Sequence, residues 1–148
     1  CEGATFELAY DYLTTVDGQA LEMNYHYHQR DMQCKDSQVA AAVSLTGFTN
    51  VESNNQEAVM EALVNGGPLG IVLDASGWGM SRHGIFNSCS YDENIDLDHG
   101  VLLVGYGVDS TAGKFWIVRN SWGGSWGEEG YIRLAMDDGT KCGMDSTP

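Results

Sequence analysis

The second half of the chain carries four short runs that are rich in β-branched and aromatic residues and are separated by glycine-rich turns. The runs are LGIVLDA, VLLVGYG, KFWIVRN and YIRLA, at residues 69–75, 101–107, 114–120 and 131–135. Apolar runs of this length, bounded by glycine, are typical of strands joined by tight turns. We therefore expect the second half to be mostly an antiparallel sheet.

A short helix is predicted near residues 5–14. Its apolar residues recur at helical spacing, and an Asp-Gly pair then supplies a stop. They are Phe6, Ala9 or Tyr10, and Leu13. Residues 19–44 are polar and irregular, and we interpret them as loop.

A second helix is predicted at about residues 54–64. Ser53 and Gln56 have the spacing of a capping box, in which the serine side chain accepts the amide of Gln56. Val59, Ala62 and Leu63 then form an apolar stripe that ends at a Gly-Gly-Pro sequence. Helices followed by strands indicate an α+β protein.

Composition excludes some classes of partner. The 148 residues are 43% hydrophobic and 19% charged, which allows a core and disfavours disorder. The net charge of -14, from 7 Lys+Arg against 21 Asp+Glu, opposes binding to nucleic acid or anionic lipid. No window approaches the roughly 18 consecutive apolar residues of a membrane span. We expect neither nucleic acid nor membrane as a partner.

Four cysteines, Cys1, Cys34, Cys89 and Cys142, are widely spaced and form no C-x-x-C pair. This pattern favours disulfides in an oxidising compartment over a zinc or thioredoxin-like motif. The chain begins with cysteine rather than methionine, so we expect it to be processed or incomplete.

The sequence GGSWG matches the G-x-S-x-G pattern of serine hydrolases, with Ser125 as the candidate nucleophile. In that pattern a helix follows the serine, and the catalytic histidine comes later in the chain. All four histidines precede Ser125, and the residues after it are typical of turn and strand. We therefore interpret Ser125 as a turn residue.

Three further motifs are weak. Residues 92–98 (DENIDLD) have the alternation of a calcium loop, but Leu97 and Leu103 stand where that loop needs glycine and glutamate. His26, His28 and Cys34 lack a fourth zinc ligand at a suitable spacing. The glycines at 105 and 107 lack the strand-to-helix context of a dinucleotide loop. We predict no metal and no cofactor.

His99 is a stronger candidate for a catalytic role. It stands just before one predicted strand, and Asn120 ends the next, so antiparallel pairing could bring the two together. A neutral imidazole is an effective general base when a fixed acceptor holds its second ring N–H. Asn120 could be that acceptor, and Trp122 could shield the hydrogen bond from water. From spacing alone, however, a lone histidine at a strand edge is more often structural.

These segments resemble the papain-like cysteine peptidases, a family that includes papain and the lysosomal cathepsins. Asp98-His99-Gly100 with VLLVGYG resembles the catalytic-histidine segment, and NSWGGSWGEEGYIRL resembles the segment of the orienting asparagine. CEGA, GGPLGIVLDAS, HGIF and CGMDS add to the similarity. The resemblance implies a papain-like α+β fold: residues 1–47 as the remainder of the helical left domain, and 48–148 as an antiparallel, β-barrel-like right domain.

The resemblance also implies a mechanism, in which His99 pairs with a reactive cysteine thiolate and Asn120 orients the imidazole. Trp122 would cover the hydrogen bond, and Trp126 would line the leaving-group side of the cleft. The family's cysteine lies upstream of the segment that CEGA resembles, and nothing in the chain matches it. We therefore expect the nucleophile and the oxyanion-hole glutamine on a missing or separate upstream segment, and this chain alone to be inactive.

The cysteine pairing follows from the same resemblance. It pairs Cys89 with Cys142 and leaves Cys1 and Cys34 to partners in the upstream segment. A mutual Cys1–Cys34 bridge is the less favoured alternative. The expected partners are thus a peptide or protein substrate, a disulfide-linked upstream segment and an inhibitory propeptide.

Substrate-binding residues are likewise implied by the resemblance. Gly3 and Ala4 would contact the substrate backbone, and Ala4 departs from the family's glycine. The specificity pocket would favour a hydrophobic side chain two positions before the cut. Its residues, with the neighbouring Asp98, are Thr5, Phe6, Val72, Leu97, Asp98, Gly100 and Thr147.

The predicted function is that of a cysteine endopeptidase. No long insertion stands between Cys1 and Cys34 to block the cleft, as it does in the exopeptidase branch of the family. The alternative is a non-catalytic homologue that binds or supports other proteins, in which the nucleophile is replaced. Charge and cysteine content suit a lysosomal, vacuolar or secreted location.

Overall fold

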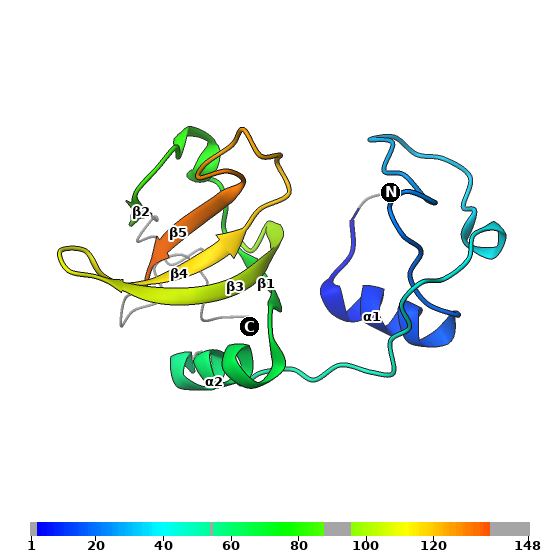
Figure 1. Cartoon of the computed structure of the whole chain (residues 1–148), viewed down its shortest axis with the longest axis horizontal. Helices are drawn as coiled ribbons and strands as arrows, with labels where there is room; N and C mark the ends of the chain where they lie inside the picture. Colours follow the sequence, from blue (N-terminus) through cyan, green and yellow to red (C-terminus); the bar gives the residue numbers. More distant parts are fainter. Residues whose placement is uncertain (1–2, 54, 88–95, 137–148) are drawn as a thin grey trace. The chain divides into compact units, whose positions relative to one another are not determined.

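The computed structural model describes residues 3–53, 55–87 and 96–136. The chain divides into two compact units, Cys1–Thr49 and Asn50–Pro148 (Figure 1). Neither α-helix in the described part of the chain is long and apolar enough to cross a membrane.

The described part of the first unit contains one α-helix, α1 (Phe6–Thr15), close to the helix predicted for residues 5–14. The hydroxyl of Thr5 caps it by accepting the amide of Leu8. The predicted loop 19–44 is confirmed in outline, and it also holds a short 3₁₀ turn, η1 (Asp36–Gln38). No side chain of α1 is buried against the described residues.

The second unit begins with α2 (Gln56–Gly66), two residues later at each end than predicted. The predicted cap was wrong: Asn55, not Ser53, accepts a backbone amide, that of Ala58, at 3.0 Å. The side-chain amide of Asn55 in turn donates to Glu52 at 2.9 Å, which holds the cap in place. Val59 and Leu63 of the predicted apolar stripe are buried in the core.

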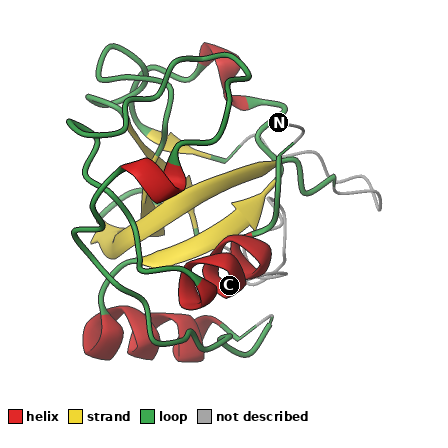
Figure 2. Ribbon diagram, turned by 90° about the vertical axis from the view of Figure 1, so that its right-hand side faces the viewer, coloured by secondary structure: helices red, strands yellow, loops and turns green. Residues whose placement is uncertain are grey.

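Among the described residues, five strands form one sheet in the order β1-β3-β4-β5-β2. The four predicted runs are confirmed as β1 (Leu69–Leu73), β3 (His99–Asp109), β4 (Gly113–Arg119) and β5 (Tyr131–Ala135), each antiparallel to the next. The sequence missed β2 (Ile85–Phe86), which pairs parallel with β5. In the described residues the edge strands β1 and β2 do not pair, so the barrel-like expectation is corrected to an open sheet (yellow in Figure 2).

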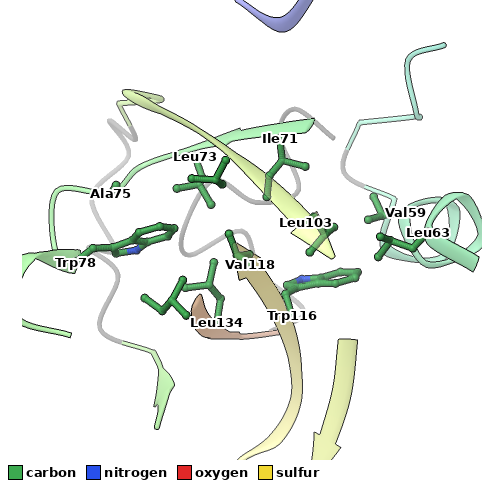
Figure 3. Packing of buried hydrophobic residues seen from close by; sticks show 12 residues of the cluster. Val59, Leu63, Ile71, Leu73, Ala75, Trp78, Leu103, Trp116, Val118 and Leu134 are labelled. Atoms are coloured by element: carbon green, nitrogen blue, oxygen red, sulfur yellow. The ribbon is translucent and has the colours of Figure 1, made fainter. Parts of the chain in front are cut away.

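The core of this unit lies between α2 and the sheet and continues along the sheet to the turn η2 (Trp78–Met80). Figure 3 shows Val59 and Leu63 of α2 at one end of this cluster, near Leu103 and Trp116, and Trp78 at the other end. Burying such side chains contributes about 1.5–3 kcal/mol each. The core therefore fixes the strand ends from which the candidate site is built.

Candidate active site

His99 and Asn120 lie at the same end of the sheet. His99 is the first residue of β3 and pairs with Leu73 of β1. Asn120 directly follows Arg119, the last residue of β4. Because β3 and β4 are antiparallel, with Leu102 opposite Arg119, the start of one strand meets the end of the other. The predicted proximity of His99 and Asn120 is confirmed.

A hydrogen bond of 2.8 Å joins Nε2 of His99 to Oδ1 of Asn120. The same Oδ1 accepts the backbone N–H of Ser121 at 2.7 Å. A backbone amide can only donate, so the oxygen of the carboxamide must face both groups, and Nε2 of His99 must carry a proton. Asn120 is buried, which keeps water from competing for the bond. In this tautomer of the neutral imidazole, the nitrogen that can accept a proton is Nδ1.

The ring of Trp122 lies against the imidazole of His99. The two rings are stacked, with the ring centroids 5.0 Å apart and the planes 29° apart. Trp126 contacts Trp122 nearly at right angles, with a centroid distance of 5.0 Å. The two predicted tryptophans thus form one aromatic layer beside the imidazole.

Sequence reasoning missed a third tryptophan. Trp78, in the turn η2, is fully buried and lies 6.1 Å from the His99 ring, with the planes 88° apart. It also stacks on Trp126 at 5.9 Å. The local signal is a tryptophan between two glycines, with four residues between it and the end of β1, and it does not indicate which residues Trp78 contacts.

The loop from β4 to β5 holds Trp122 and Trp126 by bonds within its own backbone. They are Asn120 N to Gly130 O (2.9 Å), Trp126 N to Gly123 O (3.3 Å), Gly130 N to Trp126 O (2.7 Å) and Glu128 N to Tyr131 O (2.9 Å). Gly127 adopts φ +57°, and a Cβ there would collide with the carbonyl oxygen of Tyr131. Glycine is therefore required beside Trp126. Ser125 lies exposed in the turn of this loop.

An ion pair ties the same loop to the rest of the sheet. The carboxylate of Glu128 accepts from Nη2 and Nε of Arg133 on β5, at 2.7 and 2.9 Å, and from the amide of Gly84 at 2.9 Å. Hydrogen bonding from Arg133 is the main cause that lowers the pKa of Glu128, and it raises that of Arg133. The loop between β4 and β5, residues 120–130, is called the tryptophan loop below. The charged form of Glu128 is thus the one that joins the tryptophan loop to Gly84.

Several predicted substrate residues also lie at this end of the sheet. Val72 pairs with Gly100, next to the pair of Leu73 and His99. Asp98 comes just before β3, and its carboxylate accepts the backbone amide of Ala75 at 2.9 Å. Leu97 is half-buried.

The remaining predicted substrate residues belong to the first unit or to the residues outside the described ranges. Gly3, Ala4, Thr5 and Phe6 belong to the first unit. Gly3 has φ +85°, which favours glycine, whereas Ala4 is not among the residues with positive φ, so its methyl group strains no backbone. Thr147 lies outside the described residues.

Of the four cysteines, only Cys34 belongs to the described residues, where it is exposed and unpaired. The predicted bridge between Cys89 and Cys142, and the pairing of Cys1, involve residues outside the described ranges. Across residues 3–53, 55–87 and 96–136, no group of three or more potential ligands could hold a metal ion.

Comparison with known proteins identifies the family. Residues 1–148 match the model of Peptidase_C1, described as papain family cysteine protease. The chain belongs to the papain family. Bromelain from Ananas comosus, solved with the inhibitor E64, superposes with a TM-score of 0.89 at 33% identity, over 99% of this chain and 68% of bromelain. The papain-like fold expected from the sequence is therefore confirmed.

Relatives of known sequence in the papain family are considerably longer. A cathepsin L-like protein of Caenorhabditis elegans is 36% identical over 97% of this chain, which covers 43% of the relative. Procathepsin L of Mus musculus is 38% identical over 97% of this chain, which covers 44% of it. The chain thus spans less than half the length of these papain-family proteins.

Proposed function

We propose that this chain is the part of a papain-like cysteine endopeptidase that carries its catalytic histidine and asparagine. The observation that carries the proposal is the 2.8 Å hydrogen bond from His99 to Asn120, with the ring of Trp122 against the imidazole. It sets one tautomer and leaves Nδ1 to exchange a proton with a nucleophile. Membership of the papain family supports a thiol as that nucleophile.

The proposed reaction begins when Nδ1 of His99 takes the proton of a cysteine thiol, which gives a thiolate and an imidazolium. The thiolate attacks the peptide carbonyl carbon, and the carbonyl electron pair moves to oxygen. That pair returns as the C–N bond breaks, and His99 protonates the leaving amine. In the second half His99 takes a proton from water, which attacks the thioester, and the C–S bond breaks to release the acid and restore the thiol site.

The proposal assigns the reactive cysteine, the oxyanion-hole glutamine and their backbone donors to a segment outside residues 1–148. It is supported by the sequence, in which no cysteine stands in a segment like that of the family nucleophile. A single oxyanion donor is worth about 2.7–4 kcal/mol in such reactions. The chain without that segment is therefore proposed to be inactive.

The specificity pocket is proposed to use Val72, Leu97 and Gly100 from the second unit. The register that places Val72 against Gly100, one step from His99, supports this assignment. The side chains are apolar, so a hydrophobic residue two positions before the cut is preferred. Asp98 is engaged by the amide of Ala75, which favours a supporting role for its carboxylate.

The remaining roles extend the proposal to the first unit. Gly3 and Ala4 bind the substrate backbone, while Thr5, Phe6 and Thr147 complete the pocket. Residues 1–47 and 48–148 are the left and right domains. A lysosomal, vacuolar or secreted compartment is proposed, consistent with a relative named digestive cysteine proteinase 3, from Homarus americanus.

The upstream segment is proposed to be disulfide-linked through Cys1 and Cys34, while Cys89 pairs with Cys142. Cys34 is exposed and borders a hollow of about 470 Å³ in the first unit. Leu8 and Tyr12 of α1 are 62% and 49% exposed. Apolar exposure of this kind supports coverage by another segment. An inhibitory propeptide in the precursor is consistent with the procathepsin relatives.

The proposed function is tested on the complete natural protein, with the upstream segment present. Turnover of a fluorogenic peptide with a hydrophobic residue two positions before the cut is expected, together with stoichiometric labelling by E-64 on an upstream cysteine. His99→Ala is expected to lower kcat at least about 10²-fold, and Ser125→Ala to leave it unchanged. No turnover and no thiol labelling at mildly acidic pH would favour the non-catalytic homologue.

The disulfide proposal has a separate readout. Mass spectrometry of the unreduced protein is expected to find peptides of Cys1 and Cys34 each joined to an upstream peptide. A Cys1–Cys34 peptide would contradict the proposed pairing without affecting the proposed activity.

A further inference from the structure

We infer that Trp78 is a positioning residue for His99, holding the imidazole in the orientation in which Nε2 donates to Asn120. The inference rests on the proposed function, because it matters for catalysis only if His99 transfers protons there. It begins from the ring contacts of Trp78, which lies in the turn η2, outside both motifs that carry the proposed catalytic pair.

The three tryptophans contact one another in a closed triangle. Trp78 stacks on Trp126 at 5.9 Å and meets Trp122 at 6.3 Å, while Trp122 and Trp126 are 5.0 Å apart. His99 contacts two members of the triangle, Trp122 and Trp78. A shift of any one indole therefore disturbs the surroundings of the imidazole.

The two indoles that contact His99 differ in exposure and direction. Trp122 is 43% exposed and stacks nearly parallel to the imidazole, whereas Trp78 is fully buried and lies nearly perpendicular to it. A single hydrogen bond to Asn120 leaves the ring able to tilt about that bond. Contacts from two directions restrict the tilt, and the buried indole does so from inside the protein.

The backbone of Trp78 is attached to the strand of His99. The amide of Trp78 donates to Ala75 O at 3.0 Å, and the amide of Ala75 donates to Asp98, the neighbour of His99, at 2.9 Å. Leu73, at the end of β1, pairs with His99 itself. The turn that presents Trp78 is thus fixed to residues 98 and 99 at two points.

The test compares Trp78→Met, which keeps much of the volume but removes the ring, with the conservative variant Trp78→Phe. The control is Trp116→Met, because Trp116 is equally buried but contacts Tyr106. In this chain, ¹⁵N NMR of the neutral His99 ring is expected to show the Nε2–H tautomer. Trp78→Met is expected to shift it toward the tautomer mixture of free histidine, with Trp78→Phe and the control unchanged.

In the complete protein, Trp78→Met is expected to lower kcat about tenfold or more with KM within twofold, because misplacing a catalytic group acts on the reacting step. Trp78→Phe is expected to recover kcat to within about threefold of the parent. Equal effects of Trp78→Met and Trp116→Met on tautomer and kcat, at matched folded fraction, would overturn the inference.

A measurement on the unaltered chain keeps the inference testable if Trp78→Met does not fold. Nuclear Overhauser contacts are expected between the indole protons of Trp78 and the ring protons of His99. A His99 ring without these contacts and with averaged tautomers would also overturn it. Absent turnover with an intact Nε2–H signal would instead contradict the proposed function alone.

Discussion

Oδ1 of Asn120 accepts two hydrogen bonds, from Nε2 of His99 and from the backbone N–H of the next residue. The bond from the backbone N–H of Ser121 shows that the oxygen of the carboxamide, and not its nitrogen, faces the imidazole. Nε2 of His99 must therefore be the donor in the bond to Asn120. The orientation of the amide is thus set by the chain itself, at the first residue after β4. A side chain at this position can direct His99 only if it offers an acceptor to both groups.

This requirement predicts the ranking of two variants. Asn120→Asp keeps an acceptor for both donors but buries a charge, whereas Asn120→Ala removes the acceptor and leaves both donors unpaired. In the complete protein we expect kcat to fall about 10²-fold or more for Asn120→Ala, with a smaller loss for Asn120→Asp and little change in KM. Steady-state kinetics on a peptide substrate measure this, and equal losses for both variants would contradict it.

Gly127 is predicted to be required for the shape of the tryptophan loop. A Cβ at this position, with φ +57°, meets the carbonyl oxygen of Tyr131. Gly124, in the same loop, has open space at its Cβ and no positive φ, so Gly124→Ala is the matched control. We expect Gly127→Ala to lower the unfolding free energy by about 1–3 kcal/mol, and Gly124→Ala to lower it by less than about 0.5. Urea unfolding followed by tryptophan fluorescence compares them.

Much of the second unit could be predicted from sequence because its signals are local. The four apolar runs are bounded by turns, and each became a strand that pairs with a neighbour in the expected antiparallel manner. β2 was not predicted because it is only two residues long and its partner, β5, lies more than forty residues away in the sequence. The helix cap was misplaced because Ser53 and Asn55 both offer side-chain acceptors at suitable positions, and α2 begins after Asn55.

The residues of the candidate site likewise include some that local sequence patterns predict and one, Trp78, that they do not. His99 and Asn120 were found because antiparallel strands bring the start of one to the end of the next. Trp78 was not found because its contacts with His99 and Trp126 are tertiary, and no spacing rule connects a turn after β1 with a loop after β4. Local patterns thus predicted the hydrogen-bonded pair but only part of its aromatic surroundings.

Leu103 is predicted to be among the costliest positions to truncate. It is fully buried in β3, between the pairings with β1 and β4. Leu103→Ala should lower the unfolding free energy by about 2–5 kcal/mol, because the cavity is only partly refilled. Val108→Ala, in the same strand but 75% exposed, should cost less than about 1 kcal/mol. All four tryptophans belong to the second unit, so their fluorescence reports its unfolding.

The pair of Glu128 and Arg133 predicts an acid-sensitive part of the stability. Folding lowers the pKa of Glu128 below its ordinary value of 4.5, chiefly through the hydrogen bonds from Arg133. The unfolded chain therefore binds a proton at a higher pH than the folded chain does. The stabilisation is complete above pH 4.5 and is lost as the pH falls through the lower folded value.

Glu128→Gln is the variant that tests this dependence, since it removes the charge and keeps most of the shape. We expect it to lower the unfolding free energy by about 1–2 kcal/mol near pH 6.5, with the difference from the parent shrinking as the pH falls below 4.5. Urea unfolding at a series of pH values measures both quantities. Glu61→Gln, on the exposed side of α2, removes one negative charge as the control. A difference for Glu128→Gln that stayed constant down to pH 3 would show that charge does not join the tryptophan loop to residue 84.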